Sequence, residues 1–141
     1  MNTFYDALET RSPQAREAAL MAALPGQIAH AQHHSAAFAS ILAGTDAASV
    51  SSREALARLP VTRKYELLER QQAARTRNVF GGFSALGFGP GMRRVFASPG
   101  TLYEPEGTRA DYWRMARAMY AAGFRSGELV HNSFSYHFVP A

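Results

Sequence analysis

The sequence contains no cysteine, which excludes disulfide bonds, thiolate metal sites and a cysteine nucleophile. Long hydrophobic runs are also missing. The longest, Ala18 to Leu24, is far too short to span a bilayer, which takes about 20 apolar residues. The N-terminus carries Asp6 and Glu9 where a secretory signal peptide has positive charge. These absences predict a protein of the cytoplasm with no membrane partner.

Lysine is almost absent: Lys64 is the one lysine among 15 basic residues, and the net charge is +4. A positive balance can attract partners that carry phosphate. The arginines are dispersed along the chain, however, whereas nucleic-acid binders concentrate them on one stripe. The sequence also has no recognisable nucleic-acid recognition motif. A small basic nucleic-acid-binding protein is therefore the weakest hypothesis, and we expect no nucleic-acid partner.

The first half of the chain, residues 1–77, is predicted to be helical. Ser12-Pro13 is a start signal, because serine caps free backbone N–H groups and proline at the first helical position loses no hydrogen bond. Pro25-Gly26 is predicted to break or kink this first helix before a second helical stretch. Further on, Ser51 opens a capping box, and a helix is predicted from Arg63 to about Arg75.

The second half, residues 78–141, changes character. Five glycines and a proline in residues 81–91 predict a long loop. A strand is predicted from Arg93 to Ala97, a helix with a buried apolar stripe from Thr108 to Ala122, and a strand from Glu128 to Phe134. The expected fold class is therefore α/β: a helical N-terminal half followed by the first strand-helix-strand unit of an incomplete parallel sheet. Such a unit cannot bury itself, so we expect a truncated part of a larger protein.

Ser98-Pro99-Gly100-Thr101 follows the first predicted strand as a loop of small residues. Hydroxyl groups and exposed backbone N–H groups in such a loop can surround phosphate oxygens. Taken alone, the same residues describe an ordinary turn.

Two other patterns are discounted. His30, His33 and His34 have a helical spacing that suits a metal, but no acid lies near them, so we expect a solvated helix face and no metal site. The Gly87-x-Gly89-x-Gly91 run lacks the following helix that a dinucleotide-binding motif requires.

Several segments occur in the order and spacing seen in phenylacetate-coenzyme A ligases of the adenylate-forming superfamily. They are Leu59 to Leu67, Ala97 to Thr101, Asp111 to Trp113, Ala118 to Gly123 and His131 to Tyr136. The chain resembles this family from about Leu8 to its end. The resemblance implies an enzyme that forms an acyl-adenylate from ATP and a small carboxylic acid, then a thioester with coenzyme A. The implied cofactors of the complete enzyme are ATP, Mg²⁺ and coenzyme A.

The family's phosphate loop reads two serines, glycine, two threonines, glycine, lysine and proline. Ser98, Gly100, Thr101 and Pro105 match it, and the resemblance assigns the first three of them to ATP phosphate binding. The departures are Pro99, Leu102, Tyr103 and Glu104. Glu104 stands where the family has lysine, so its carboxylate repels phosphate unless it turns away or a magnesium ion intervenes.

Phe134 and Tyr136 match a tyrosine-glycine-tyrosine segment that borders the acyl pocket in these ligases, with Ser135 and His137 in place of glycines. The resemblance assigns Phe134, Tyr136 and His137 to substrate binding, and aromatic walls suit an aryl acid. Without the resemblance, burial in the core is the better interpretation of these rings.

The leading hypothesis is the N-terminal part of an aryl-acid ligase that is inactive on its own. The family's remaining nucleotide-binding segments and catalytic lysine would lie beyond Ala141, so no catalytic residue is assigned. The alternative is a non-catalytic, ligase-like binding or assembly module with a degenerate phosphate loop. The expected macromolecular partner is a second copy of the chain or the remainder of the protein, because an incomplete sheet leaves an open edge.

Overall fold

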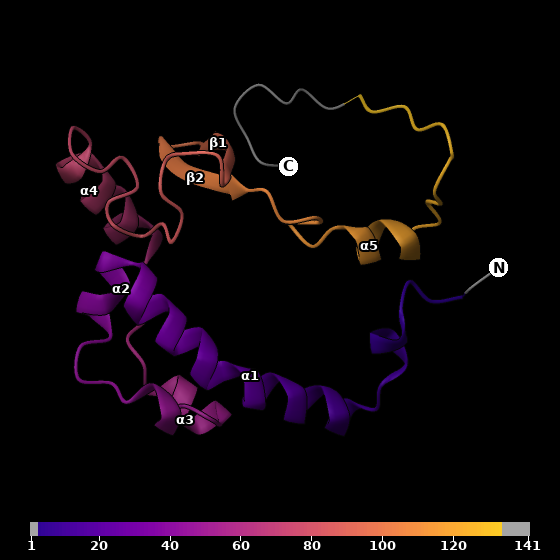
Figure 1. Cartoon of the computed structure of the whole chain (residues 1–141), viewed down its shortest axis with the longest axis horizontal. Coiled ribbons are helices and arrows are strands. Elements are labelled where there is room, and N and C mark those ends of the chain that lie inside the picture. The colour runs from indigo at the N-terminus through magenta and orange to yellow at the C-terminus, as the bar shows by residue number, and fades with distance from the viewer. Residues whose placement is uncertain (1–2, 134–141) are drawn as a thin grey trace.

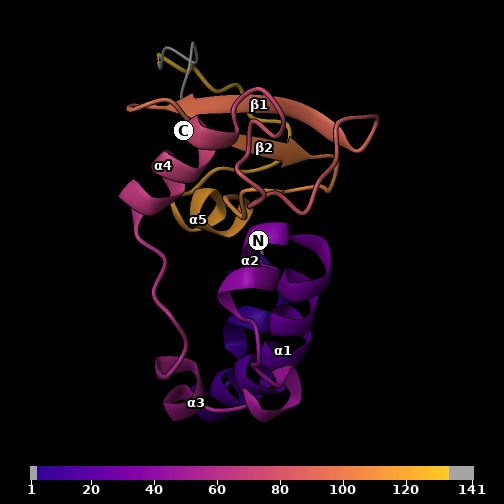
Figure 2. The same cartoon turned by 90° about the vertical axis from the view of Figure 1, so that its left-hand side faces the viewer.

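The computed structural model describes residues 3–133 (Figure 1). In chain order the elements are the 3-10 helix η1 (Ala7–Thr10), α1 (Pro13–His34), α2 (Ala36–Ile41), the 3-10 helix η2 (Ala47–Ser49), α3 (Arg53–Ala57), α4 (Lys64–Ala74), β1 (Met92–Ser98), β2 (Leu102–Gly107) and α5 (Ala116–Ala121). The chain therefore combines helices with a small sheet, and the predicted helical N-terminal half is confirmed. Figure 2 shows a lower layer of α1, α2 and α3, and above it α4, the two strands and α5.

Helix α1 begins as the sequence predicts but does not end where predicted. The Ser12 hydroxyl accepts a hydrogen bond from the Ala15 N–H at 3.1 Å, and Pro13 is the first helical residue. Of the break or kink predicted at Pro25-Gly26, the break does not occur, because the helix continues to His34. Proline removes one backbone hydrogen bond, but its fixed φ is helical, and Ile28 in the following turn is buried in the core.

The lower layer has a small core of four buried side chains. These are Ile28, Leu42, Val50 and Ala55. The Gln32 amide donates to the carbonyls of Leu42 and Thr45 at 3.1 and 2.9 Å, which holds the turn after α2 against α1. Helix α3 is capped by the Ser52 hydroxyl, one residue later than predicted.

The glycine-rich loop is anchored at its start to the junction of α1 and α2. Ser35 is buried, and its hydroxyl donates to the Gly82 carbonyl at 2.8 Å. The same carbonyl accepts from the Ala37 N–H at 3.0 Å. The Phe83 ring meets Phe38 edge to face at 5.5 Å. Residues 80–83 therefore connect the lower layer to α4 and the hairpin.

Strands β1 and β2 form an antiparallel hairpin. The strand predicted from Arg93 is confirmed, but its partner is residues 102–107, for which no strand was predicted. A short turn favours this pairing, because neighbouring segments lose little entropy when they meet. No strand forms in residues 128–133. The predicted strand-helix-strand unit is therefore absent from the described residues, which form an antiparallel hairpin followed by α5.

The predicted helix from Thr108 shortens to α5. Asp111 and Arg114 have φ of +49° and +57°, a left-handed conformation that an α-helix cannot include. Asp111 instead accepts from the Ala116 N–H at 3.0 Å, next to the start of α5. The apolar stripe is not buried, since Met115 and Met119 are both exposed. The predicted burial of that stripe is wrong.

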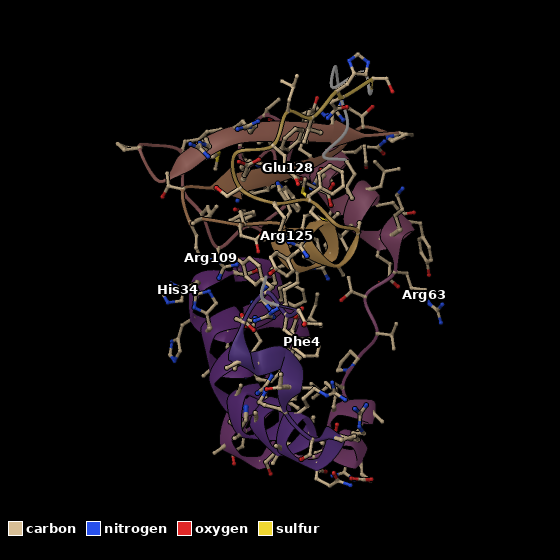
Figure 3. All side chains as sticks on the ribbon, turned by 90° about the vertical axis from the view of Figure 1, so that its right-hand side faces the viewer. Phe4, His34, Arg63, Arg109, Arg125 and Glu128 are labelled. Carbon is tan, nitrogen blue, oxygen red and sulfur yellow. The ribbon has the colours of Figure 1, made fainter. Side chains whose placement is uncertain are left out.

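The N-terminal segment packs on α5. The Tyr5 and Tyr120 rings meet edge to face at 5.7 Å, and Arg117 pairs with Asp6. Hydrogen bonding to Arg117 holds the pKa of Asp6 below its ordinary value, so this pair weakens only as the pH falls through that lowered pKa. At the other end of α5, Arg125 donates to the Tyr120 carbonyl at 2.8 Å (Figure 3).

Much of the surface is exposed for a chain of this size. The accessible area is 10258 Å², against about 7,200 Å² for a compact monomer of 15.4 kDa. Among residues 3–133, none of the helices has the length and apolar character needed to cross a bilayer.

Candidate functional site

A cleft of about 800 Å³ lies where the two layers meet. Its floor and walls come from α1, α2, α4, the glycine-rich loop, β2 and the segment that follows β2. Six aromatic rings line it: Phe38, Phe80, Phe83, Tyr103, Tyr112 and Trp113. The volume lies in the range of small-molecule sites, and the lining combines these rings with polar and charged side chains.

The aromatic wall is held by its own contacts. Tyr112 and Trp113 meet edge to face at 5.2 Å, and Trp113 meets Phe96 of β1 in the same way at 5.9 Å. Edge-to-face pairs align the positive ring edge with the negative face and so fix ring orientation. The indole of Trp113 is therefore a preformed part of the wall, although 40% of the residue is exposed.

A buried carboxylate orients this indole. Glu106 is 6% exposed, accepts a hydrogen bond from the Trp113 indole N–H at 3.0 Å, and pairs with Arg94 at 3.5 Å. Arg94 lies opposite Glu106 in the register of the hairpin. Glu106 was not predicted from the sequence, because the signal for it is the antiparallel pairing of two segments, which places Arg94 beside it.

The segment after β2 contributes two positively charged side chains to the cleft. Arg109 and Arg114 both line it, and the Arg109 guanidinium lies 5.7 Å from the centre of the Tyr112 ring. Figure 3 shows Arg109 at the level where the hairpin layer meets the C-terminal end of α1, which carries His34. An arginine beside aromatic faces can pair with an anion whose apolar part packs on the rings.

Gln71 joins α4 to the hairpin at the edge of the cleft. Its side chain is fully buried, accepts from the Tyr103 N–H at 2.8 Å, and donates to the Tyr103 carbonyl at 3.0 Å. The amide therefore pairs with β2 as a neighbouring strand would.

The predicted phosphate-binding residues lie at the tip of the hairpin, and none of them lines the cleft. The Thr101 N–H donates to the Ser98 carbonyl at 2.9 Å, which closes a β-turn with Pro99 and Gly100 at its centre. Gly100 has φ of +99°, as the third residue of a type II turn requires. Residues 99–101 are exposed, and Glu104, three residues after the turn, does line the cleft.

The other predicted residues are not brought to this site. Phe134, Tyr136 and His137 lie outside the described residues. His30 lines the cleft and its ring lies 4.5 Å from that of His34, and both side chains are exposed together with His33. Within residues 3–133, no group of three or more histidine or acidic side chains is arranged to hold a metal ion.

No family model, curated protein or solved structure matches this chain. The functional assignment therefore depends on the residues of the cleft and the hairpin.

Replacing Glu106 with leucine is expected to lower the free energy of unfolding by about 2 kcal/mol, because the Trp113 N–H and Arg94 lose their acceptor. Trp113 is the only tryptophan, so its fluorescence reports the change directly, as an emission shift towards longer wavelength. Glu106→Gln keeps an acceptor and should preserve the emission. Glu104→Leu is the control, since Glu104 has no ion-pair partner within residues 3–133. Equal shifts in the two leucine variants would refute the orienting role of Glu106.

Proposed function

We propose that this chain is the acid-binding front portion of a phenylacetate-coenzyme A ligase-like protein, and that the cleft binds an aromatic carboxylate. The cleft, with six aromatic side chains and two arginines in its lining, is the observation that carries this proposal. Tyr112 and Trp113 of this lining belong to a segment that suggested the family, whereas Phe38, Phe80 and Phe83 do not. The parallel sheet of the adenylate-forming fold belongs to the same proposal, and residues 3–133 do not form it.

The lining offers groups for both parts of such a ligand, its aryl ring and its carboxylate. An aryl ring buries its faces against Phe80, Tyr112 or Trp113, and its carboxylate is within the positive field of Arg109. A charge-assisted hydrogen bond from arginine to a carboxylate is about twice as strong as a neutral one. The pairing of Arg109 with the carboxylate makes the cleft bind an aryl acid more tightly than an uncharged aryl compound.

Adenylation is not assigned to residues of this chain. In the proposal, ATP approaches the exposed tip at Ser98, Gly100 and Thr101, and the remaining catalytic groups come from elsewhere in the complete enzyme. The isolated chain, mixed with ATP, Mg²⁺ and phenylacetate, should release no pyrophosphate.

The binding proposal is tested by titrating the chain with phenylacetate and following Trp113 fluorescence. Saturable quenching is expected, with phenylacetamide binding about tenfold more weakly, because it lacks the charge that Arg109 pairs with. Arg109→Gln should lower the affinity for phenylacetate to that for phenylacetamide. The affinity for phenylacetamide should not change. Arg77→Gln, an exposed arginine outside the cleft, is the matched control. Equal affinity for acid and amide would sink the proposal.

A second function, a binding module that has lost nucleotide chemistry, is favoured by the geometry of the hairpin tip. The turn uses the Thr101 N–H for its own closure, and the Ser98 hydroxyl lies 3.5 Å from the Leu102 carbonyl. Glu104 adds negative charge close to the turn. Phenylacetate binding whose affinity is unchanged by saturating ATP and Mg²⁺ in the complete gene product would favour this second function over the ligase.

A further inference from the structure

We propose that the outer edge of β1 pairs with β1 of a second copy of the chain, in an antiparallel register centred on Val95. The proposal goes beyond ligand binding in the cleft and does not depend on it. It starts from the two edges of the hairpin, because a two-stranded sheet has one free edge on each strand, and an isolated hairpin has marginal stability in water.

The edge of β2 is already protected. Both main-chain groups of Tyr103 are taken by the Gln71 amide. The next residue that faces the same way is Pro105, which has no N–H to donate. A new strand therefore gains little from pairing with β2.

Within residues 3–133, the edge of β1 is open at the matching positions. Ala97 is the partner of Tyr103, and Val95 is the partner of Pro105. Because the main-chain groups of Tyr103 point away from β1, the alternation of an antiparallel ladder directs those of Ala97 and Val95 away from β2. No other strand among residues 3–133 pairs with them, and Val95 is 41% exposed.

The sequence of β1 is compatible with its own antiparallel copy. A two-fold axis at Val95 places Val95 opposite Val95, Arg93 opposite Ala97 and Arg94 opposite Phe96. No arginine lies directly opposite another arginine. The two Arg94 side chains are diagonal neighbours, and each has the Glu106 carboxylate of its own chain as a counter-ion. Arg94 already lies 5.8 Å from the centre of its own Phe96 ring, and the axis offers it a second ring on the facing strand. The product is a four-stranded antiparallel sheet.

The absence of cysteine provides a direct test. In the proposed register the two Val95 Cα atoms form a hydrogen-bonded pair about 5.5 Å apart, which is within the range that a disulfide spans. We expect Val95→Cys to form a disulfide-linked dimer rapidly under mild oxidation. Val61→Cys is the control, because Val61 is 72% exposed but lies in the loop before α4, and it should link only slowly. Equal rates for the two variants would overturn the proposal.

Light scattering provides the second test. The unmodified chain should change from monomer to dimer as its concentration rises through the micromolar range. Val95→Pro should remain monomeric, because it removes an N–H that the hairpin itself does not use. Val95→Thr, which keeps that N–H, should still dimerise. A monomer at every concentration, or a dimer that survives Val95→Pro, contradicts the pairing. Unchanged Trp113 fluorescence confirms that the variants fold, and phenylacetate binding tests the cleft separately.

Discussion

Replacing Gln71 with leucine should lower the free energy of unfolding by about 3 to 4 kcal/mol, measured by urea denaturation. Leucine has nearly the volume of glutamine, so the packing of α4 is preserved and the loss is polar. The Tyr103 N–H and carbonyl both lose their partner. Each unsatisfied main-chain group in a buried setting costs about 1 to 3 kcal/mol.

Gln72→Leu is the matched control on the same helix. Gln72 is exposed and its side chain has no hydrogen-bond partner in the part of the chain that the structure describes, so its replacement should change stability by about 0.5 kcal/mol at most. Gln71→Leu should also alter Trp113 fluorescence, because β2 carries Glu106 beside the indole. The idea fails if the two leucine variants have the same stability.

Gly81→Ala should destabilise the protein by about 3 kcal/mol or more. Gly81 has φ of +61°, where an alanine costs about 1 kcal/mol. A Cβ atom there would lie 2.9 Å from the Gln71 nitrogen and 3.0 Å from the Arg70 carbonyl carbon. Both are backbone atoms of α4, so relief of the contact requires the loop to move away from the helix.

The control is Gly87→Ala in the same glycine-rich loop. No atom lies within 4 Å of a Cβ at Gly87, and its φ is not positive. Its replacement should be neutral or slightly stabilising, because alanine restricts the unfolded chain. Thermal unfolding of the two variants compares them directly, and an unchanged midpoint for Gly81→Ala would show that the loop does not press on α4.

Local signals in the sequence predicted local structure well. The Ser12-Pro13 start of α1, the loop in residues 81–91 and the strand at residues 93–97 all form. Each depends on hydrogen bonds or φ preferences within a few residues. Pro25 was misread because its effect depends on context: burial of Ile28 in the following turn supports a helix that the proline alone would weaken.

Long-range pairing could not be predicted in the same way. The bond between Gln71 and Tyr103 joins residues 32 positions apart, and a glutamine in the middle of a helix carries no signal for it. The cleft was missed for the same reason, since its rings come from segments that meet only in the fold. Gly100 and Thr101 were placed correctly after a strand, of which Ser98 is the last residue. The proposed role of these three residues in phosphate binding stays a prediction.

The side-chain amide of Gln71 also couples the movement of α4 to that of the hairpin. Because it fixes β2 to α4, the helix cannot rotate without carrying Tyr103 and the hairpin with it. Tyr103 is part of the cleft wall, and the tip at residues 99–101 lies directly before β2. Under the proposed function, a ligand that restrains Tyr103 in the cleft is expected to restrain the tip as well. Any such coupling is reciprocal, so a molecule held at the tip would change ligand affinity in the cleft by the same factor.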